Sequence, residues 1–369
     1  MMPCAETVPP TTSSNRMPPI ARFAWLTLAC NIAVILWGAY VRATGSGAGC
    51  GNKWPLCNGD VLPNTAHAHT AIEFAHRISS ALVVVLVSSL VVWTWRRTSK
   101  GAWTRYSATL ATILLLNEAL LGALLVVFDR VAQDQSSGHA LLLGLHFGNT
   151  LLLIASLSLT AYWLSNGECR FTVSRKPGKT DAIGIGLAAV MIIGITGSLA
   201  GLVDTTFPAT SLRASLMQDF SASSYHLLRL RLLHPIAAMI GGIYVVWIIS
   251  KGSTRHVRFS PRPSVLIMVF ILQIALGAMN VVMLAPVWLQ IVHLFIADVF
   301  WILLVLASAN LCLGSEAVKT KRHARDVTQR VASTFGIATY GSKLAIVDDE
   351  SRYPERQDAQ GKSSCLGAR

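Results

Sequence analysis

The chain has 369 residues, of which 53% are hydrophobic and only 13% are charged, and its mean hydropathy is +0.51. Soluble domains carry about a quarter charged residues, so this chain has too few polar side chains to cover a globular surface in water. The composition argues against a soluble enzyme and predicts a protein that has lipid as part of its solvent.

Apolar segments of about 20 residues, long enough to cross about 30 Å of hydrocarbon as helices, occur eight times. In chain order we expect them at 20–41, 72–95, 104–128, 139–163, 182–203, 230–250, 264–284 and 287–312. They use more than half of the chain. The sequence therefore predicts an all-α integral membrane protein with eight transmembrane helices and no sizeable water-soluble domain.

The remaining segments flank or connect these helices. Residues 1–19 are rich in Pro, Ser and Thr, which predicts a disordered cytoplasmic leader. Residues 164–181 are expected to form a cytoplasmic linker, and residues 313–369 a basic cytoplasmic tail to which we assign no chemistry.

The formal net charge of +13 is distributed unevenly along the chain. The connections at 96–105, 164–180 and 251–262 hold four Lys and Arg residues each and the tail after residue 312 holds ten, whereas no alternate connection holds more than two. This asymmetry follows the positive-inside rule. It predicts a multi-pass protein of the cell (inner) membrane with both termini in the cytoplasm, contact with anionic lipid, and no nucleic-acid partner.

Two of the seven cysteines, Cys50 and Cys57, share the predicted outer loop. Their spacing would allow a disulfide in an oxidising compartment. A structural staple and a redox-responsive bond that accepts thiol exchange are both compatible with the sequence.

The two halves of the chain resemble each other. The segment EALLGA at 118–123 is similar to QIALGA at 273–278, and each precedes a helix that carries a histidine, His146 or His293. His76 and His234 occupy matching places in the second and sixth helices. With four helices in each unit, the two units have the same orientation across the membrane. The repeat predicts two pseudo-symmetric four-helix bundles, at 20–163 and 182–312.

Histidines inside membrane helices are rare and are functional candidates. Each of the four lies one to two turns below the outer surface, so the two in each half can face each other across a bundle. Opposed neutral imidazoles are the ligands that a six-coordinate haem iron requires. Zinc is the alternative metal, but it normally needs three or four ligands. We therefore expect one haem between His76 and His146 and another between His234 and His293.

The residues beside the two histidine pairs differ in charge. Glu73 precedes His76 by three residues, whereas Arg231 has the matching place before His234. A carboxylate can act as a base or stabilise a developing cation, while an arginine can pair with haem propionates. This difference predicts chemistry in the N-terminal half and electron storage in the C-terminal half. A structural ion pair between Glu73 and Arg77 is the alternative.

Two further acids lie within predicted helices, Glu118 and Asp298. We expect each to form a hydrogen bond across helices, with a proton path as the alternative.

These residues resemble the haem A synthase family over about 20–312. The most specific stretches are GAYVRATGSGAGC at 38–50, WPLCNG at 54–59 and IEFAHR at 72–77, together with the sequences around His146, His234 and His293. Some members carry a second cysteine pair in the outer loop between the fifth and sixth helices, and residues 204–229 of this chain contain no cysteine.

The resemblance implies an oxidoreductase that converts haem O to haem A by oxidising the C8 methyl group to a formyl group, with water as the oxygen source. It implies haem b as the cofactor on His234 and His293, the substrate haem between His76 and His146, and Glu73 as the catalytic residue. Arg77 and Arg231 would be propionate partners, and Cys50 and Cys57 would form the family's outer disulfide.

A di-haem b membrane electron carrier is the alternative function, because it would need the same four histidines. For the synthase, the implied partners are the haem O substrate, a haem O synthase and the lipid bilayer. The electron acceptor and the oligomeric state are left open, and a homo-oligomer is one option.

Overall fold

The computed structural model describes residues 17–63, 66–131, 134–166, 179–220, 226–251, 261–313, 339–340 and 343–344. Eight of its helices are long and apolar enough to cross a membrane. They are α1 (Pro19–Ala43), α2 (Ala68–Arg97), α3 (Trp103–Val127), α4 (Ser137–Asn166), α5 (Lys179–Thr206), α7 (Leu230–Ser250), α8 (Pro263–Val282) and α9 (Val287–Leu313). Each contains or nearly matches one predicted span, so the predicted multi-pass membrane protein is confirmed.

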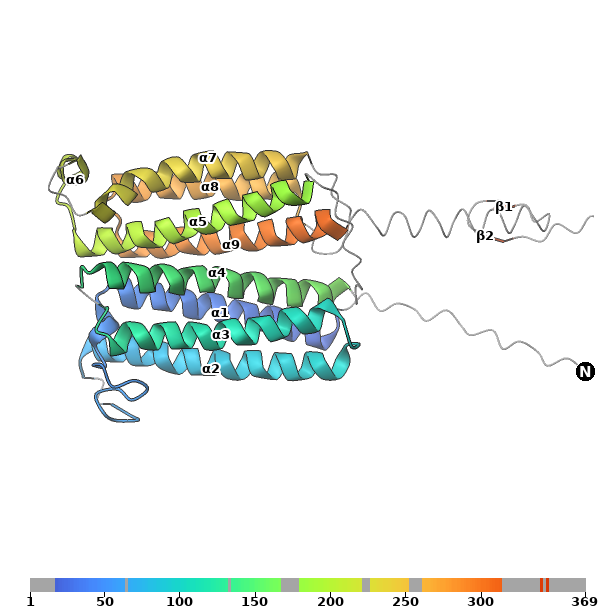
Figure 1. Cartoon of the computed structure of the whole chain (residues 1–369), viewed down its shortest axis with the longest axis horizontal. Coiled ribbons are helices and arrows are strands. Elements are labelled where there is room, and N and C mark those ends of the chain that lie inside the picture. Colours follow the sequence, from blue (N-terminus) through green and yellow to red (C-terminus); the bar gives the residue numbers. More distant parts are fainter. Residues whose placement is uncertain are drawn as a thin grey trace, which may run out of the picture. The chain divides into compact units, whose positions relative to one another are not determined.

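The long helices form two groups of four (Figure 1). Helices α1 to α4 pack on one another, and α5, α7, α8 and α9 form the second group. The groups meet where α4 packs against α5 and α9, and where α1 packs against α9. At this junction the Trp301 indole N–H donates to the Leu151 carbonyl oxygen at 2.7 Å. Both groups lie in one compact unit, Met1–Gly314.

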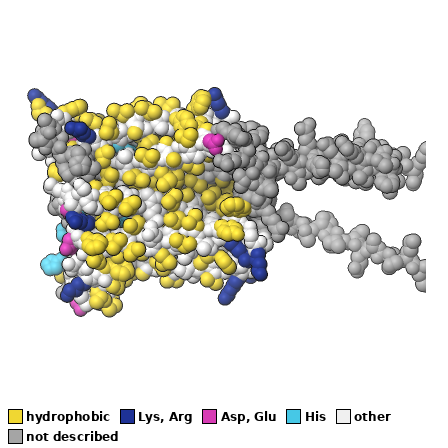
Figure 2. Space-filling model, in the orientation of Figure 1, with side chains coloured by type: hydrophobic (Ala, Val, Ile, Leu, Met, Phe, Trp, Pro, Cys, Tyr) yellow, Lys and Arg dark blue, Asp and Glu magenta, His cyan; other side chains and the backbone are white. Residues whose placement is uncertain are grey.

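The sides of the helical body are apolar (Figure 2). Large aliphatic side chains on the outward faces are well exposed, among them Leu82 and Val85 of α2 and Met268 and Ile271 of α8. Lys and Arg side chains gather at the two ends of the helices instead, such as Arg96 and Arg97 in the last turn of α2. This distribution fits helices whose outer faces contact lipid.

Prolines help to set the start of two spans. Pro19 is the first residue of α1 and Pro263 is the first residue of α8. The first turn of a helix has no internal partner for its N–H groups, so the missing N–H of proline has no cost there. By contrast, Pro235 lies inside α7, one residue after His234.

The connection at 204–229 contains a short helix, α6 (Leu212–Phe220), which no apolar run predicted, and a 3₁₀ turn, η2 (His226–Arg229). The Ser211 hydroxyl accepts a hydrogen bond from the Ala214 N–H at 3.2 Å and so caps α6. Leu212, Leu216 and Phe220 recur every four residues and are exposed. This amphipathic pattern suits a membrane interface better than a span.

The C-terminal unit contains one short hairpin among its described residues. In the second unit, Ser315–Arg369, the strands β1 (Thr339–Tyr340) and β2 (Lys343–Leu344) pair antiparallel. Most of the predicted leader, linker and tail lies outside the described residues, while Pro19, the last residue of the predicted leader, already begins α1.

Candidate functional site

The structure brings the four predicted histidines together as two pairs. His76 and His146 lie near the starts of α2 and α4, and their imidazoles are close enough to interact electrostatically. His234 and His293 occupy similar places in α7 and α9, and they also interact. All four rings are half-buried. Each pair therefore joins two different helices of one four-helix group near the same end of the molecule.

Each imidazole packs against a glycine of the preceding long helix. A Cβ atom added to Gly38 would lie 2.9 Å from His76 Cε1, and one added to Gly197 would lie 2.6 Å from His234 Cε1. The corresponding distances are 3.2 Å from Gly277 to His293 and 3.8 Å from Gly122 to His146. The glycines thus provide the space for the rings, most tightly at the first histidine of each half.

Two of these four glycines could have been found from the internal repeat of the sequence. Gly122 and Gly277 are the matching glycines in the repeated segments at 118–123 and 273–278. Gly38 and Gly197 have no such repeat signature, because their segments diverge between the halves. Only the packing of adjacent helices reveals them.

The imidazoles suit a haem iron better than a zinc ion. The Nδ1 atoms of His76 and His293 are buried and have no hydrogen-bond partner in the described part of the chain, and His146 Nδ1 lies 3.2 Å from Glu118 Oε1. Among the described residues, no group of three or more His, Cys, Asp and Glu side chains could hold a metal ion. A pair of imidazoles from neighbouring helices of an apolar bundle meets the needs of a bis-histidine iron, whereas zinc would require further ligands.

Glu73 is buried in the second turn of α2, with only 3% of its surface exposed. Its Oε1 atom accepts hydrogen bonds from Arg77 Nη2 at 2.6 Å and Arg77 Nε at 3.1 Å. Its Oε2 atom accepts the backbone N–H of Cys50 at 2.7 Å. The predicted ion pair with Arg77 is therefore present, but it is one part of a larger arrangement that also includes the cysteine loop.

The cysteine loop is closed by the predicted disulfide between Cys50 and Cys57. Arg77 Nη1 donates to the Leu56 carbonyl oxygen at 2.8 Å, and the Thr70 hydroxyl donates to the Gly49 carbonyl oxygen at 2.8 Å. The loop is thus fixed to the first turns of α2. Arg77 thus connects the loop to Glu73. The propionate role predicted for Arg77 stays a prediction, since its partners in the structure are Glu73 and the loop.

We expect Gly49→Ala to weaken the attachment of this loop. A Cβ atom at Gly49 would lie 2.4 Å from the His69 backbone oxygen, and backbone at that distance must shift. The expected loss of stability is about 1–3 kcal/mol, measured as a lower thermal unfolding midpoint in detergent. Gly47→Ala is the matched control, since its Cβ would lie 3.3 Å from the Val131 side chain, which can adjust. Equal midpoints for the two variants would contradict this account of the loop.

Glu118 forms the predicted hydrogen bonds across helices. From α3 it accepts Asn149 Nδ2 of α4 on Oε2 at 2.5 Å, and the Thr150 hydroxyl on Oε1. Its Oε1 atom also lies 3.2 Å from His146 Nδ1. The carboxylate is therefore placed directly beside one of the candidate iron ligands.

Asp298 does not form the predicted hydrogen bond. It lies on α9 and is fully buried, and both of its carboxylate oxygens have no hydrogen-bond partner in the part of the chain that the structure describes. The expectation for this residue was therefore wrong, and the expectation for Glu118 is confirmed.

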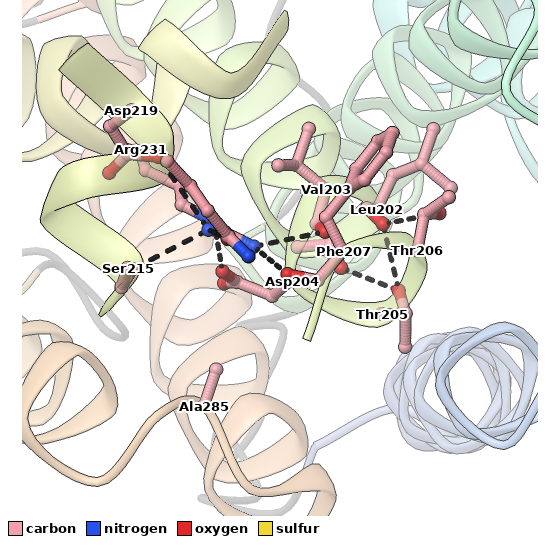
Figure 3. A network of polar contacts seen from close by, with 12 residues as sticks. Leu202, Val203, Asp204, Thr205, Thr206, Phe207, Ser215, Asp219, Arg231 and Ala285 are labelled. Carbon is pink, nitrogen blue, oxygen red and sulfur yellow. Dashed lines mark hydrogen bonds and ion pairs between the residues drawn. The ribbon is translucent and has the colours of Figure 1, made fainter. Parts of the chain in front are cut away.

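Arg231 is held by a network of acids and carbonyl groups (Figure 3). Its Nε atom lies 2.7 Å from Asp204 Oδ1, and its Nη1 atom lies 3.5 Å from Asp219 Oδ1. Nη2 donates to the Phe207 carbonyl oxygen at 2.6 Å. Burial raises the pKa of the Asp219 carboxyl, against the opposing effect of Arg231. The network joins α7 to α5 and α6, and the propionate role predicted for Arg231 stays a prediction.

Arg42 connects the two helical groups, although it lies outside the four histidines and their neighbours in sequence. It lies in the last turn of α1, yet its Nη1 atom donates to Thr205 Oγ1 of α5 at 3.3 Å and its Nη2 atom donates to Gln290 Oε1 of α9 at 3.2 Å. One guanidinium thus connects the N-terminal helices to the C-terminal group. The sequence motif at 38–50 included Arg42 but gave no indication of these distant partners.

These features define a multi-pass membrane protein in which each of two four-helix groups presents a histidine pair near the same end of its helices. A family model described as cytochrome oxidase assembly protein, COX15-CtaA, matches residues 21–305. Because this match covers well over half of the chain, the protein belongs to that family.

Named relatives fall into two kinds. A Thermus thermophilus protein named protoheme IX farnesyltransferase is 39% identical over 306 residues, which cover 81% of this chain and 50% of that protein. A heme A synthase of Exiguobacterium sp. is 25% identical over 283 residues, covering 76% of this chain and 90% of that protein. A Bacillus licheniformis heme A synthase is 39% identical over 134 residues, which cover 36% of this chain and 41% of that protein. The chain spans about half the length of the first curated relatives it matches.

Proposed function

We propose that this protein is a haem A synthase, which oxidises the C8 methyl group of haem O to a formyl group. The observation that carries the proposal is the unequal surroundings of two equivalent histidine pairs. Glu73 and Glu118 lie near His76 and His146, whereas the matching positions in the other half are Arg231 and Gln273. A protein that only conducted electrons would not need carboxylates at one pair alone. Several relatives named heme A synthase support the same activity.

In this proposal His76 and His146 hold the substrate haem, and His234 and His293 hold a haem b cofactor. The cofactor would supply a one-electron carrier inside the membrane. Converting a methyl to a formyl group adds one water oxygen and releases four electrons and four protons, which leave to an external acceptor. The assignment of substrate to the N-terminal half is supported by the position of Glu73, one helical turn before His76.

Glu73 would be the residue that stabilises positive charge developing at the oxidised carbon and accepts a proton from the attacking water. Each of its two oxygens accepts a hydrogen bond from a different partner: Oε2 from the Cys50 N–H at 2.7 Å and Oε1 from the Arg77 guanidinium at 2.6 Å. This arrangement keeps the carboxylate preorganised and shields it from bulk water. The disulfide loop would therefore serve the reaction by positioning a backbone donor.

The test is Glu73→Gln, which keeps the size of the side chain but removes its capacity to accept a proton. We expect haem to stay bound and haem A to disappear, as measured by pigment extraction from protein purified after haem O supply. Asp60→Asn is the matched control, because Asp60 is an exposed acid of the connection between α1 and α2. Undiminished haem A in Glu73→Gln would refute the assignment. Two equivalents of haem b alone in the wild-type protein would favour a di-haem electron carrier.

The proposed substrate also suggests a partner. The Thermus relative is named for farnesyl transfer to protohaem, and this chain aligns with half of it. Farnesylated haem is haem O, the proposed substrate. We therefore propose that a haem O synthase in the same membrane delivers its product to this protein. The outer location of the histidine pairs and the cytoplasmic location of both termini in the inner membrane belong to the same proposal and are supported by the charge of the connections.

A further inference from the structure

The polar groups that contact the histidine rings differ between the two halves. In the N-terminal half, the Glu118 carboxylate lies 3.2 Å from His146 Nδ1. That nitrogen is buried, and the carboxylate is an acceptor within hydrogen-bond distance of it. Both partners are mostly shielded, with 26% of the His146 side chain and 16% of the Glu118 side chain exposed.

The Glu118 carboxylate is itself fixed in place. Asn149 Nδ2 donates to its Oε2 atom, and the Thr150 hydroxyl donates to its Oε1 atom. Asn149 is held in turn by Asn117, whose Nδ2 atom donates to Asn149 Oδ1 at 2.9 Å. Asn149 and Thr150 come three and four residues after His146 on the same helix. The network therefore places a preorganised acceptor of α3 beside a histidine of α4.

The C-terminal half has no equivalent of this network among its described residues. The residue that matches Glu118 in the repeat is Gln273, and its Nε2 atom lies 3.2 Å from His293 Nε2, the other ring nitrogen. The residues three and four positions after His293 are Ile296 and Ala297, which have no polar side-chain atoms. His293 Nδ1 has no hydrogen-bond partner in the described residues. An amide and two apolar side chains thus replace a carboxylate and two donors.

This difference has a known chemical effect on an iron-bound imidazole. A carboxylate that accepts the N–H of the ring fixes its tautomer and orientation and makes the other nitrogen a stronger donor to the metal. The Gln273 amide presents an N–H donor to His293 and accepts no ring N–H, so it has no such effect. A more strongly donating ligand stabilises the oxidised iron and lowers its reduction potential.

We propose that Glu118 is a positioning residue for His146, which orients the ring through Nδ1 and makes His146 the most strongly electron-donating of the four histidine ligands. The inference rests on the proposed function, since it concerns the histidine pair assigned to the substrate haem. Its consequence is that the haem in the N-terminal half is easier to oxidise than the same haem would be in a site built like the C-terminal half.

The experiment uses full-length protein in detergent with protohaem added until both sites are filled. Reduction potentials of the two haems are measured by spectroelectrochemical titration in the wild-type protein, in two reciprocal variants and in one conservative variant, Glu118→Asp. We expect Glu118→Gln to raise the potential of the N-terminal haem and leave the other unchanged. Gln273→Glu should lower the potential of the C-terminal haem. In Glu118→Asp the potential of the N-terminal haem should lie between the wild-type value and the Glu118→Gln value.

The two variants keep the inference testable if one of them fails to fold, because each half reports separately. Unchanged potentials in folded Glu118→Gln, or an equal change in both haems, would overturn the role of Glu118. An unchanged potential together with normal haem A production would contradict this inference alone. A shifted potential in a protein that never produces haem A would contradict the proposed function alone.

Discussion

On the proposed assignment of a haem b cofactor to the C-terminal half, His234→Ala and His293→Ala are expected to remove most of that haem from the purified protein. Each side chain would supply one of the two histidine ligands of the haem iron, from α7 or α9, so either substitution would remove half of the protein ligands in an apolar site. Removing a partner that only orients a metal ligand reduces metal affinity about 10- to 100-fold, so loss of the ligand itself should cost at least as much. Pyridine haemochrome analysis of the purified variants measures the retained haem.

The matched variants are His76→Ala and His146→Ala, which change the equivalent positions of the other half. We expect them to retain haem b with an almost unaltered spectrum and to lose binding of added substrate haem. The reverse pattern would show that the resident and substrate sites have been assigned to the wrong halves. Equal loss in all four variants would show that haem in one half depends on haem in the other.

Gly197→Ala is expected to disturb the C-terminal site nearly as much as loss of a ligand. Its Cβ atom would lie 2.6 Å from His234 Cε1, closer than real Cβ contacts, so the imidazole or the helix must move. Overpacking of this kind costs about 1–3 kcal/mol, and displacing the His234 ring would weaken its capacity to hold a haem iron. The absorption spectrum should report a loss of low-spin bis-histidine haem.

Gly184→Ala is a control on the same helix, because nothing lies within 4 Å of a Cβ atom there. Replacing glycine with alanine in a helix is favourable by up to about 1 kcal/mol when there is space, so this variant should keep the wild-type spectrum and stability. In the N-terminal half, Gly38→Ala should impair substrate haem binding more than Gly122→Ala, whose Cβ lies at an ordinary 3.8 Å from His146. A wild-type spectrum for Gly197→Ala would contradict the proposed role of the glycines.

The spans and the histidine pairs could be predicted from sequence because both depend on local or repeated patterns. Twenty apolar residues have few alternatives to a membrane helix, and the repeat at 118–123 and 273–278 fixed the matching of His146 with His293. The disulfide was also accessible, since only Cys50 and Cys57 share one predicted outer loop. Several helices, among them α2 and α4, extend beyond the predicted spans by a few residues, because polar residues continue a helix beyond its apolar part.

Other features depend on contacts between residues far apart in the chain. The partners of Arg42 lie 163 and 248 residues away, and no periodicity connects them. The short helix α6 lacks a long apolar run, so hydropathy could not distinguish it from a loop. Asp298 shows the opposite difficulty: its burial in a span was predictable, but whether a neighbouring helix offers it a donor depends on side-chain packing.

The link made by Arg42 limits what pseudo-symmetry can mean for this molecule. If the first four helices were produced as a separate polypeptide, the Arg42 guanidinium would lose its hydrogen bonds to Thr205 and Gln290. A charged group would then lie at the end of a membrane-spanning helix without these partners. The other polypeptide would in turn expose the apolar face that includes Trp301. The two four-helix groups therefore stabilise each other, and we expect neither group to fold stably in a membrane without the other.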